Sequence, residues 1–96
     1  MITEHTQDTE HQIRTALAEG KTVWERMGVE GDVKSIWDPN KADEVEAKRR
    51  EFEYLTKEKK YRAYRVTGTN GDRGEPMDTF EAAAGRVLFV PPMQGG

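Results

Sequence analysis

The chain ends with a strand-like run and a short tail, Arg86-Val87-Leu88-Phe89-Val90-Pro91-Pro92-Met93-Gln94-Gly95-Gly96. In an extended strand, alternate side chains point to opposite faces, so Val87 and Phe89 share one face while Leu88 and Val90 share the other. Both faces are therefore apolar, which is typical of a strand buried on both sides. We predict a central strand in a sheet with a covering layer on each face.

Upstream of this strand, the sequence alternates between strand and helix patterns. Residues 21–27 and 33–37 are rich in Val, Ile and Trp and flank a glycine-containing turn, which predicts a hairpin. Residues 41–60 have acidic side chains early and lysines late, as the dipole of a helix prefers. Residues 61–66 return to a strand pattern. The order strand, strand, helix, strand, strand predicts an α+β domain with a β-grasp-like ββαββ sheet.

An additional helix is predicted ahead of this sheet. Ile13, Ala16 and Leu17 form one apolar stripe behind a capping-box pattern at residues 9–12, and Gly20 is well placed to end the helix. Because the stripe is narrow, this helix needs a surface to dock on. We expect it, or a partner protein, to cover the sheet face that the long helix leaves open.

Composition limits the function classes. The 96 residues suit one domain, which we divide into an N-terminal arm and helix (1–20), a β-grasp-like domain (21–90) and a flexible Gly-Gly tail (91–96). The net charge of -3 is interspersed along the chain, so we expect no nucleic-acid partner. The longest apolar run, 87–90, is too short to cross a bilayer, so we expect no membrane partner and a cytoplasmic protein.

Candidate catalytic and metal-binding groups are few. The chain has no cysteine, and His5 and His11 lack the spacing of four that puts two imidazoles on one metal. Gly68, Gly71 and Gly74 recur in a loop, but no Gly-Lys-Ser/Thr follows, so we interpret them as loop residues. The carboxylates of residues 43–53 lie on a helix face that pairs them with basic side chains. We therefore expect no catalytic residue, no metal site and no cofactor.

Two tryptophans fall in adjacent predicted strands. Trp24 and Trp37 could stack across the hairpin as core residues, or one of them could project as an interface anchor. A core with so few apolar residues needs its aromatic side chains, so burial is the default expectation.

The C-terminal tail is the strongest candidate for a functional element. Pro91 and Pro92 stop the strand and extend the chain away from the sheet, and Met93 continues toward Gly95 and Gly96. A terminus without bulky side chains can enter a narrow channel, so an enzyme could approach the terminal carboxylate closely.

This ending resembles that of the sulfur-carrier and ubiquitin-like β-grasp proteins, above all the small subunit of molybdopterin synthase. The match covers residues 85–96. The resemblance implies that Gly96 is the carboxylate to be activated, that Gly95 is its slender neighbour, and that Pro91-Pro92 is a spacer. It further implies an adenylating enzyme as partner. The predicted N-terminal helix departs from these families, whose first strand begins near the N-terminus.

A second resemblance covers more of the chain. Ile36-Trp37-Asp38-Pro39, the helix at 44–55, Tyr61-Arg62-Ala63-Tyr64-Arg65-Val66 and the Val-Pro-Pro ending look like small phage and prophage proteins. This resemblance implies a virion accessory role, with capsid or tail proteins as partners and the virion as location. A third interpretation makes Gly95-Gly96 simply a small-residue chain end. All three hypotheses remain open at the level of sequence.

Overall fold

The structure, a computed structural model, describes residues 2–28, 32–66 and 74–92, with side chains of the first helix from Glu10 onward. The elements follow in the order α1 (Ile2–Ala18), β1 (Thr22–Arg26), β2 (Val33–Trp37), α2 (Ala42–Glu53), the π-helical turn η1 (Tyr54–Glu58), β3 (Arg62–Arg65), β4 (Glu75–Pro76) and β5 (Arg86–Val90). The protein is thus a mixed α+β domain, as its sequence predicts.

The five strands form one mixed sheet in the order β2-β1-β5-β3-β4. β1 pairs antiparallel with β2 and parallel with β5, while β5 pairs antiparallel with β3. The prediction that residues 86–90 form a central strand is confirmed. The two ends of β5 are held by further backbone bonds, from Val23 N–H to the Gly85 carbonyl and from Met27 N–H to the Phe89 carbonyl.

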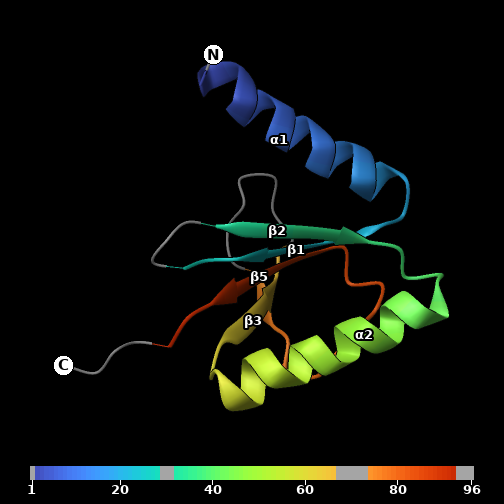
Figure 1. The fold of residues 1–96 in the computed structure, drawn as a ribbon, viewed down its shortest axis with the longest axis vertical. Helices are drawn as coiled ribbons and strands as arrows, with labels where there is room; N and C mark the ends of the chain where they lie inside the picture. The colour runs from blue at the N-terminus through green and yellow to red at the C-terminus, as the bar shows by residue number, and fades with distance from the viewer. Residues whose placement is uncertain (1, 29–31, 67–73, 93–96) are drawn as a thin grey trace.

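The helices lie on opposite faces of this sheet (Figure 1). The α2 face carries the main core, in which Phe52 and Leu55 pack over Phe89 of the central strand. Met77 is buried in the same core, and Phe80 packs against it, so the connection between β4 and β5 folds back over the sheet.

The face opposite α2 is covered by α1 along β1. Ile13 and Ala16 pack on Val23 with Leu17 beside them, and this cluster is separate from the main core. Gly20 takes a φ of 81° directly after the helix, a left-handed conformation that suits glycine at a helix end. The predicted docking of the first helix on the sheet is therefore observed, and it involves few apolar side chains.

Helix α1 begins at Ile2, earlier than the capping-box pattern at residues 9–12 predicts. Thr9 lies inside the helix, so the prediction that it caps the start is wrong. A capping box is a local pattern, and adding residues to a helix that already exists is far easier than nucleating one. The polar residues ahead of Thr9 therefore extend the helix without an apolar stripe of their own.

The long helix also ends differently from the prediction. Residues 41–60 were expected to be one α-helix, whereas α2 ends at Glu53 and η1 follows, with Lys59 N–H bonded to the Tyr54 carbonyl five residues earlier. Thr56 Oγ1 donates to the Phe52 carbonyl at 2.8 Å, which draws that carbonyl away from regular helical geometry. The wider turn keeps Leu55 buried, and Lys60 ends the helix with a φ of 62°.

The second edge of the sheet is a strand that the sequence pattern does not predict. β4 is only two residues long and pairs with β3 at Tyr64 and Arg65. The glycine-rich loop assigned to residues 67–74 lies outside the described residues except at Gly74.

Candidate functional site

The root of the C-terminal tail is fixed by the most buried strand of the sheet. Val87 and Phe89 are both 0% exposed, and β5 has a hydrogen-bonded neighbour on each side. Directly after Val90, Pro91 and Pro92 are exposed. Because proline has no backbone N–H, these residues cannot continue the ladder to β1 or β3. The chain therefore leaves the sheet from its centre.

The end of the sheet from which the tail leaves has both apolar and basic groups. Met27, just beyond β1, is 40% exposed, and Arg62, which pairs with Val90, is exposed as well. On the α2 side of β3 lies a pocket of about 230 Å³, lined by Thr56, Tyr61, Arg62, Ala63, Pro76, Met77 and Asp78. Met93, Gly95 and Gly96 lie outside the described residues.

Both tryptophans belong to the core. Trp24 and Trp37 are each 3% exposed, and their rings meet edge to face at 5.7 Å between centroids. Phe80 stacks on Trp37 at 6.0 Å, and Lys48 Nζ lies 5.0 Å from the centre of the Trp24 ring. The alternative in which one tryptophan anchors an interface does not fit side chains buried this deeply, because a lean core uses its largest apolar groups internally.

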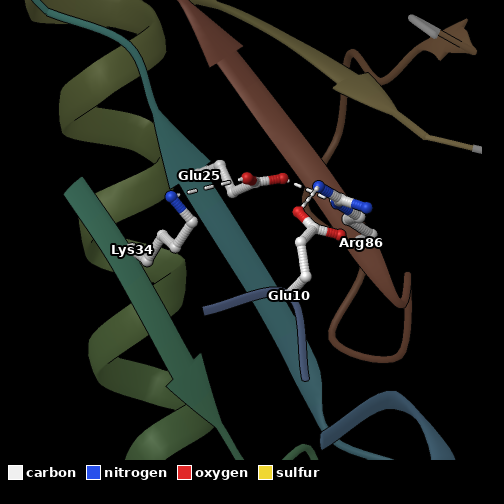
Figure 2. A network of polar contacts seen from close by, with 4 residues as sticks. All are labelled: Glu10, Glu25, Lys34 and Arg86. Carbon is white, nitrogen blue, oxygen red and sulfur yellow. Dashed lines mark hydrogen bonds and ion pairs between the residues drawn. The ribbon is translucent and has the colours of Figure 1, made fainter. Parts of the chain in front are cut away.

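A chain of alternating charges crosses the sheet face on the α1 side (Figure 2). Arg86 Nε donates to Glu25 Oε1 at 2.6 Å, and Glu25 Oε2 lies 3.9 Å from Lys34 Nζ. On the other side, Arg86 Nη2 lies 3.9 Å from Glu10 Oε2 of α1. Hydrogen bonding to Glu25 raises the pKa of Arg86, partly offset by burial. Four elements are thus joined by paired charges.

This network has a structural role that its geometry explains. The parallel pairing of β1 and β5 places Glu25 beside Leu88, so that its carboxylate reaches the guanidinium of Arg86, which pairs with Val23. Each carboxylate faces a cation and each cation faces a carboxylate, so opposite charges are adjacent throughout the network. Sequence reasoning missed this network because the residues are far apart in the chain and only the strand register brings them together.

Most of the histidines and glycines singled out in the sequence cannot be compared, because they fall outside the described part of the chain. His11 is exposed on α1, and the side chain of His5 lies outside the described residues, as do Gly68 and Gly71. Within the described ranges, no group of three or more His, Cys, Asp or Glu side chains could hold a metal ion. Over the same ranges, no helix has the length and apolar character needed to cross a membrane.

No protein-family model matches this chain, and neither the curated proteins nor the solved structures include a match.

Proposed function

We propose that this protein is a non-catalytic carrier or modifier of the ubiquitin-like and sulfur-carrier kind, and that it acts through the Gly95-Gly96 tail. The proposal includes the β-grasp fold. It is supported by the sheet order β2-β1-β5-β3-β4, with the first and last strands parallel and α2 across one face. In this proposal, the tail follows the central strand of the sheet.

The observation that carries the proposal is the contrast between β5, which is buried and paired on both sides, and the tail after it, which begins with exposed prolines and ends with two glycines. β5 is held on both sides and buried at Val87 and Phe89, whereas Pro91 and Pro92 are exposed and cannot pair. A partner can therefore bind the folded domain at one surface and the end of the tail at another. Glycines at that end let the walls of an active site approach the backbone.

The chemistry would belong to the partner. An adenylating enzyme joins the terminal carboxylate oxygen to the α-phosphate of ATP and releases pyrophosphate. Hydrosulfide or an amine then displaces AMP, which leaves a thiocarboxylate or an amide on Gly96. In this proposal, the chain itself supplies no catalytic group and no cofactor. It supplies a carboxylate on a spacer.

The alternative function, a virion accessory protein, is favoured by one feature of the structure. Helix α1 docks on the sheet with Ile13, Ala16 and Leu17, and the other described side chains of the helix are exposed. A carrier that acts only through its tail has no need of such an element. In a particle, the polar surface of α1 would contact neighbouring capsid or tail subunits.

The test is intact-mass analysis of the protein recovered from its native host. We expect either a mass shift corresponding to one oxygen replaced by sulfur or a covalent adduct. One extra residue after Gly96 should abolish the modification, whereas one extra residue at the N-terminus, the matched control, should not. The measurement also checks that Gly96 carries the terminal carboxylate. An unmodified mass together with co-purifying particle proteins would contradict the carrier function and support the alternative.

A further inference from the structure

The tail is too short to separate its end from the folded domain. Four residues follow Pro92, and an extended chain gains at most about 3.5 Å per residue, so Gly96 lies within about 14 Å of Pro92. An enzyme that holds the Gly96 carboxyl group in its active site therefore has its surface against the end of the sheet from which the tail leaves. Because this follows only when Gly96 is the activated residue, a docking surface at this end rests on the carrier function proposed above.

The two helices leave the end of the sheet as the place of approach. α2 packs over one face at Phe52 and Leu55, and α1 packs over the other face at Val23 of β1. Figure 1 shows the helices on opposite sides of the sheet and the C-terminal end of β5 at one end of the layer between them. A partner that takes the tail therefore contacts the end of this layer.

Exposed apolar side chains lie beside the tail at this end. Met27 N–H donates to the Phe89 carbonyl at 3.0 Å, close to where the tail begins, and Met27 is 40% exposed. Val33 lies opposite Arg26 at the start of β2 and is 50% exposed. Among the described residues, the other large apolar side chains that are exposed are Ile36 and Tyr54. Together with the exposed prolines of the tail, Met27 and Val33 form an apolar area of the kind that marks an interaction site.

Several cations at this end lack the ion pairs that other cations of the described chain form. The cations in ion pairs are Lys21, Lys34, Lys41, Lys48, Arg50, Arg65 and Arg86. No described carboxylate pairs with Arg26 of β1 or Arg62 of β3, which lie on either side of the end of β5. Lys57 and Lys60, shortly before Arg62, are exposed and likewise unpaired within the described ranges. The remaining described cations without an ion pair are Arg14, Arg49 and Lys59.

Carboxylates are fewer than cations at this end. Residues 57–62 carry four cations and one carboxylate, Glu58. Asp32 lies just before β2, and Asp78 lines the pocket beside Arg62. The chain as a whole, in contrast, has a net charge of -3. The tail therefore leaves an acidic protein through a locally basic surface, which attracts a partner that carries carboxylates there.

We propose that this end of the sheet, which we call the tail-root surface, docks the enzyme that activates Gly96. The surface consists of exposed apolar side chains and unpaired cations: Met27, Val33, Arg26, Lys60 and Arg62. The matching surface of the enzyme is apolar where it meets Met27 and acidic where it meets Arg62. Opposite charges speed the encounter and fix the orientation, whereas the desolvated apolar contact holds the complex together. The domain is then held in place while the tail enters the active site.

The test follows how fast newly synthesised chain becomes modified in its native host, again by intact-mass analysis of the full chain. Met27→Asp and Arg62→Glu should each slow modification at least about fivefold, the loss typical of residues that carry an interface. Ile36→Asp is the matched apolar control, since Ile36 is 42% exposed and pairs with Val23 away from the tail. Arg14→Glu on the exposed side of α1 is the matched charge control. Both controls should leave the rate unchanged.

A longer tail distinguishes docking from misfolding. Four glycines inserted between Pro92 and Met93 extend the reach beyond Pro92 to about 28 Å, so an enzyme can hold Gly96 without pressing on the sheet. In this longer chain, Met27→Asp should slow modification much less than it does at the natural length. A variant that is slow because it is unfolded would stay slow in both chains.

The outcomes separate this surface from the function on which it rests. A wild-type chain that is never modified would overturn the carrier function and the tail-root surface with it. A wild-type chain that is modified no faster than Met27→Asp and Arg62→Glu would overturn the tail-root surface alone. Slowing by the two controls to the same extent would do so as well, and so would slowing by Met27→Asp that is undiminished in the longer chain.

Discussion

Replacing Ile13 with alanine tests whether α1 is a separately docked unit or part of one cooperative domain. Ile13 is 1% exposed and packs with Ala16 and Val23, in a cluster distinct from the main core. The substitution removes three carbons from an apolar contact. At about 0.8 kcal/mol per buried carbon, plus a small cavity term, docking weakens by about 2.5 kcal/mol. That loss corresponds to roughly a 70-fold drop in the docking equilibrium constant.

The loss should be confined to α1. Among the described side chains of α1, from Glu10 onward, those that hold it besides Ile13 and Ala16 are the half-buried Leu17 and Glu10, which lies 3.9 Å from Arg86. These contacts are too few to keep the helix docked once most of the apolar contact is lost. We expect α1 to undock while the sheet and α2 stay folded, because Phe52, Leu55 and Phe89 pack without it. Once α1 is undocked, further weakening of its contacts no longer matters. Ile13→Ala can therefore lower the free energy of global unfolding by no more than the free energy with which α1 docks on the sheet.

Amide hydrogen exchange measures both parts in one experiment. In Ile13→Ala, the amides at the C-terminal end of α1 should lose about 70-fold in protection, while those of β5 keep theirs. Arg14→Ala, on the exposed side of the same helix, is the matched control and should change neither. Equal loss of protection in α1 and β5 would refute the reasoning, because it would place the helix in the same cooperative unit as the main core.

Two further substitutions, each with a matched comparison, can be tested by urea unfolding. The first removes one hydrogen bond, and the second places a side chain at a positive φ. Thr22→Val removes the bond from Thr22 Oγ1 to the Ala82 carbonyl, 2.6 Å long at a residue 0% exposed, and should cost about 1–2 kcal/mol. Thr56→Val is its less buried control and should cost less, so an equal loss would contradict this account. Gly85→Ala should cost about 1–2 kcal/mol from its φ of 82° alone, since no atom lies within 4 Å of the added carbon. Gly20→Ala, at a φ of 81° with the same open space, should cost a similar amount, and a neutral Gly85→Ala would contradict the backbone argument.

Elements with a strong local pattern were predictable from the sequence. β2 and β5 have the predicted bounds, and the central position of β5 followed from apolar residues on both of its faces. The burial of Trp24 and Trp37 followed from the scarcity of apolar residues. In each case the deciding property lies within a few neighbouring residues. The sequence also placed Pro91-Pro92 at the end of the central strand, which is the part of the candidate site that depends on local pattern.

Elements that depend on contacts between distant residues could not be predicted. β4 is a strand only because Glu75 and Pro76 come to lie beside β3. The charge network needs the parallel register that sets Glu25 near Arg86, which no periodicity in either segment encodes. The exposed edge of β2 is likewise a property of strand order. Local pattern therefore predicted the elements, whereas pairing determined which surfaces are available for binding.

The parallel pairing of β1 with β5 also determines when the domain can fold. The bond between Glu25 and Arg86 spans 61 residues of sequence, and the strands on which they lie form the middle of the sheet. A loop of that length has to close, at an entropic cost, before the contacts that reward it can form. During synthesis, a nascent chain from which residue 85 has just emerged would still lack the strand that carries Val87 and Phe89. Its aromatic side chains would remain exposed until that strand arrives, so this is the stage at which protection by a chaperone would matter most.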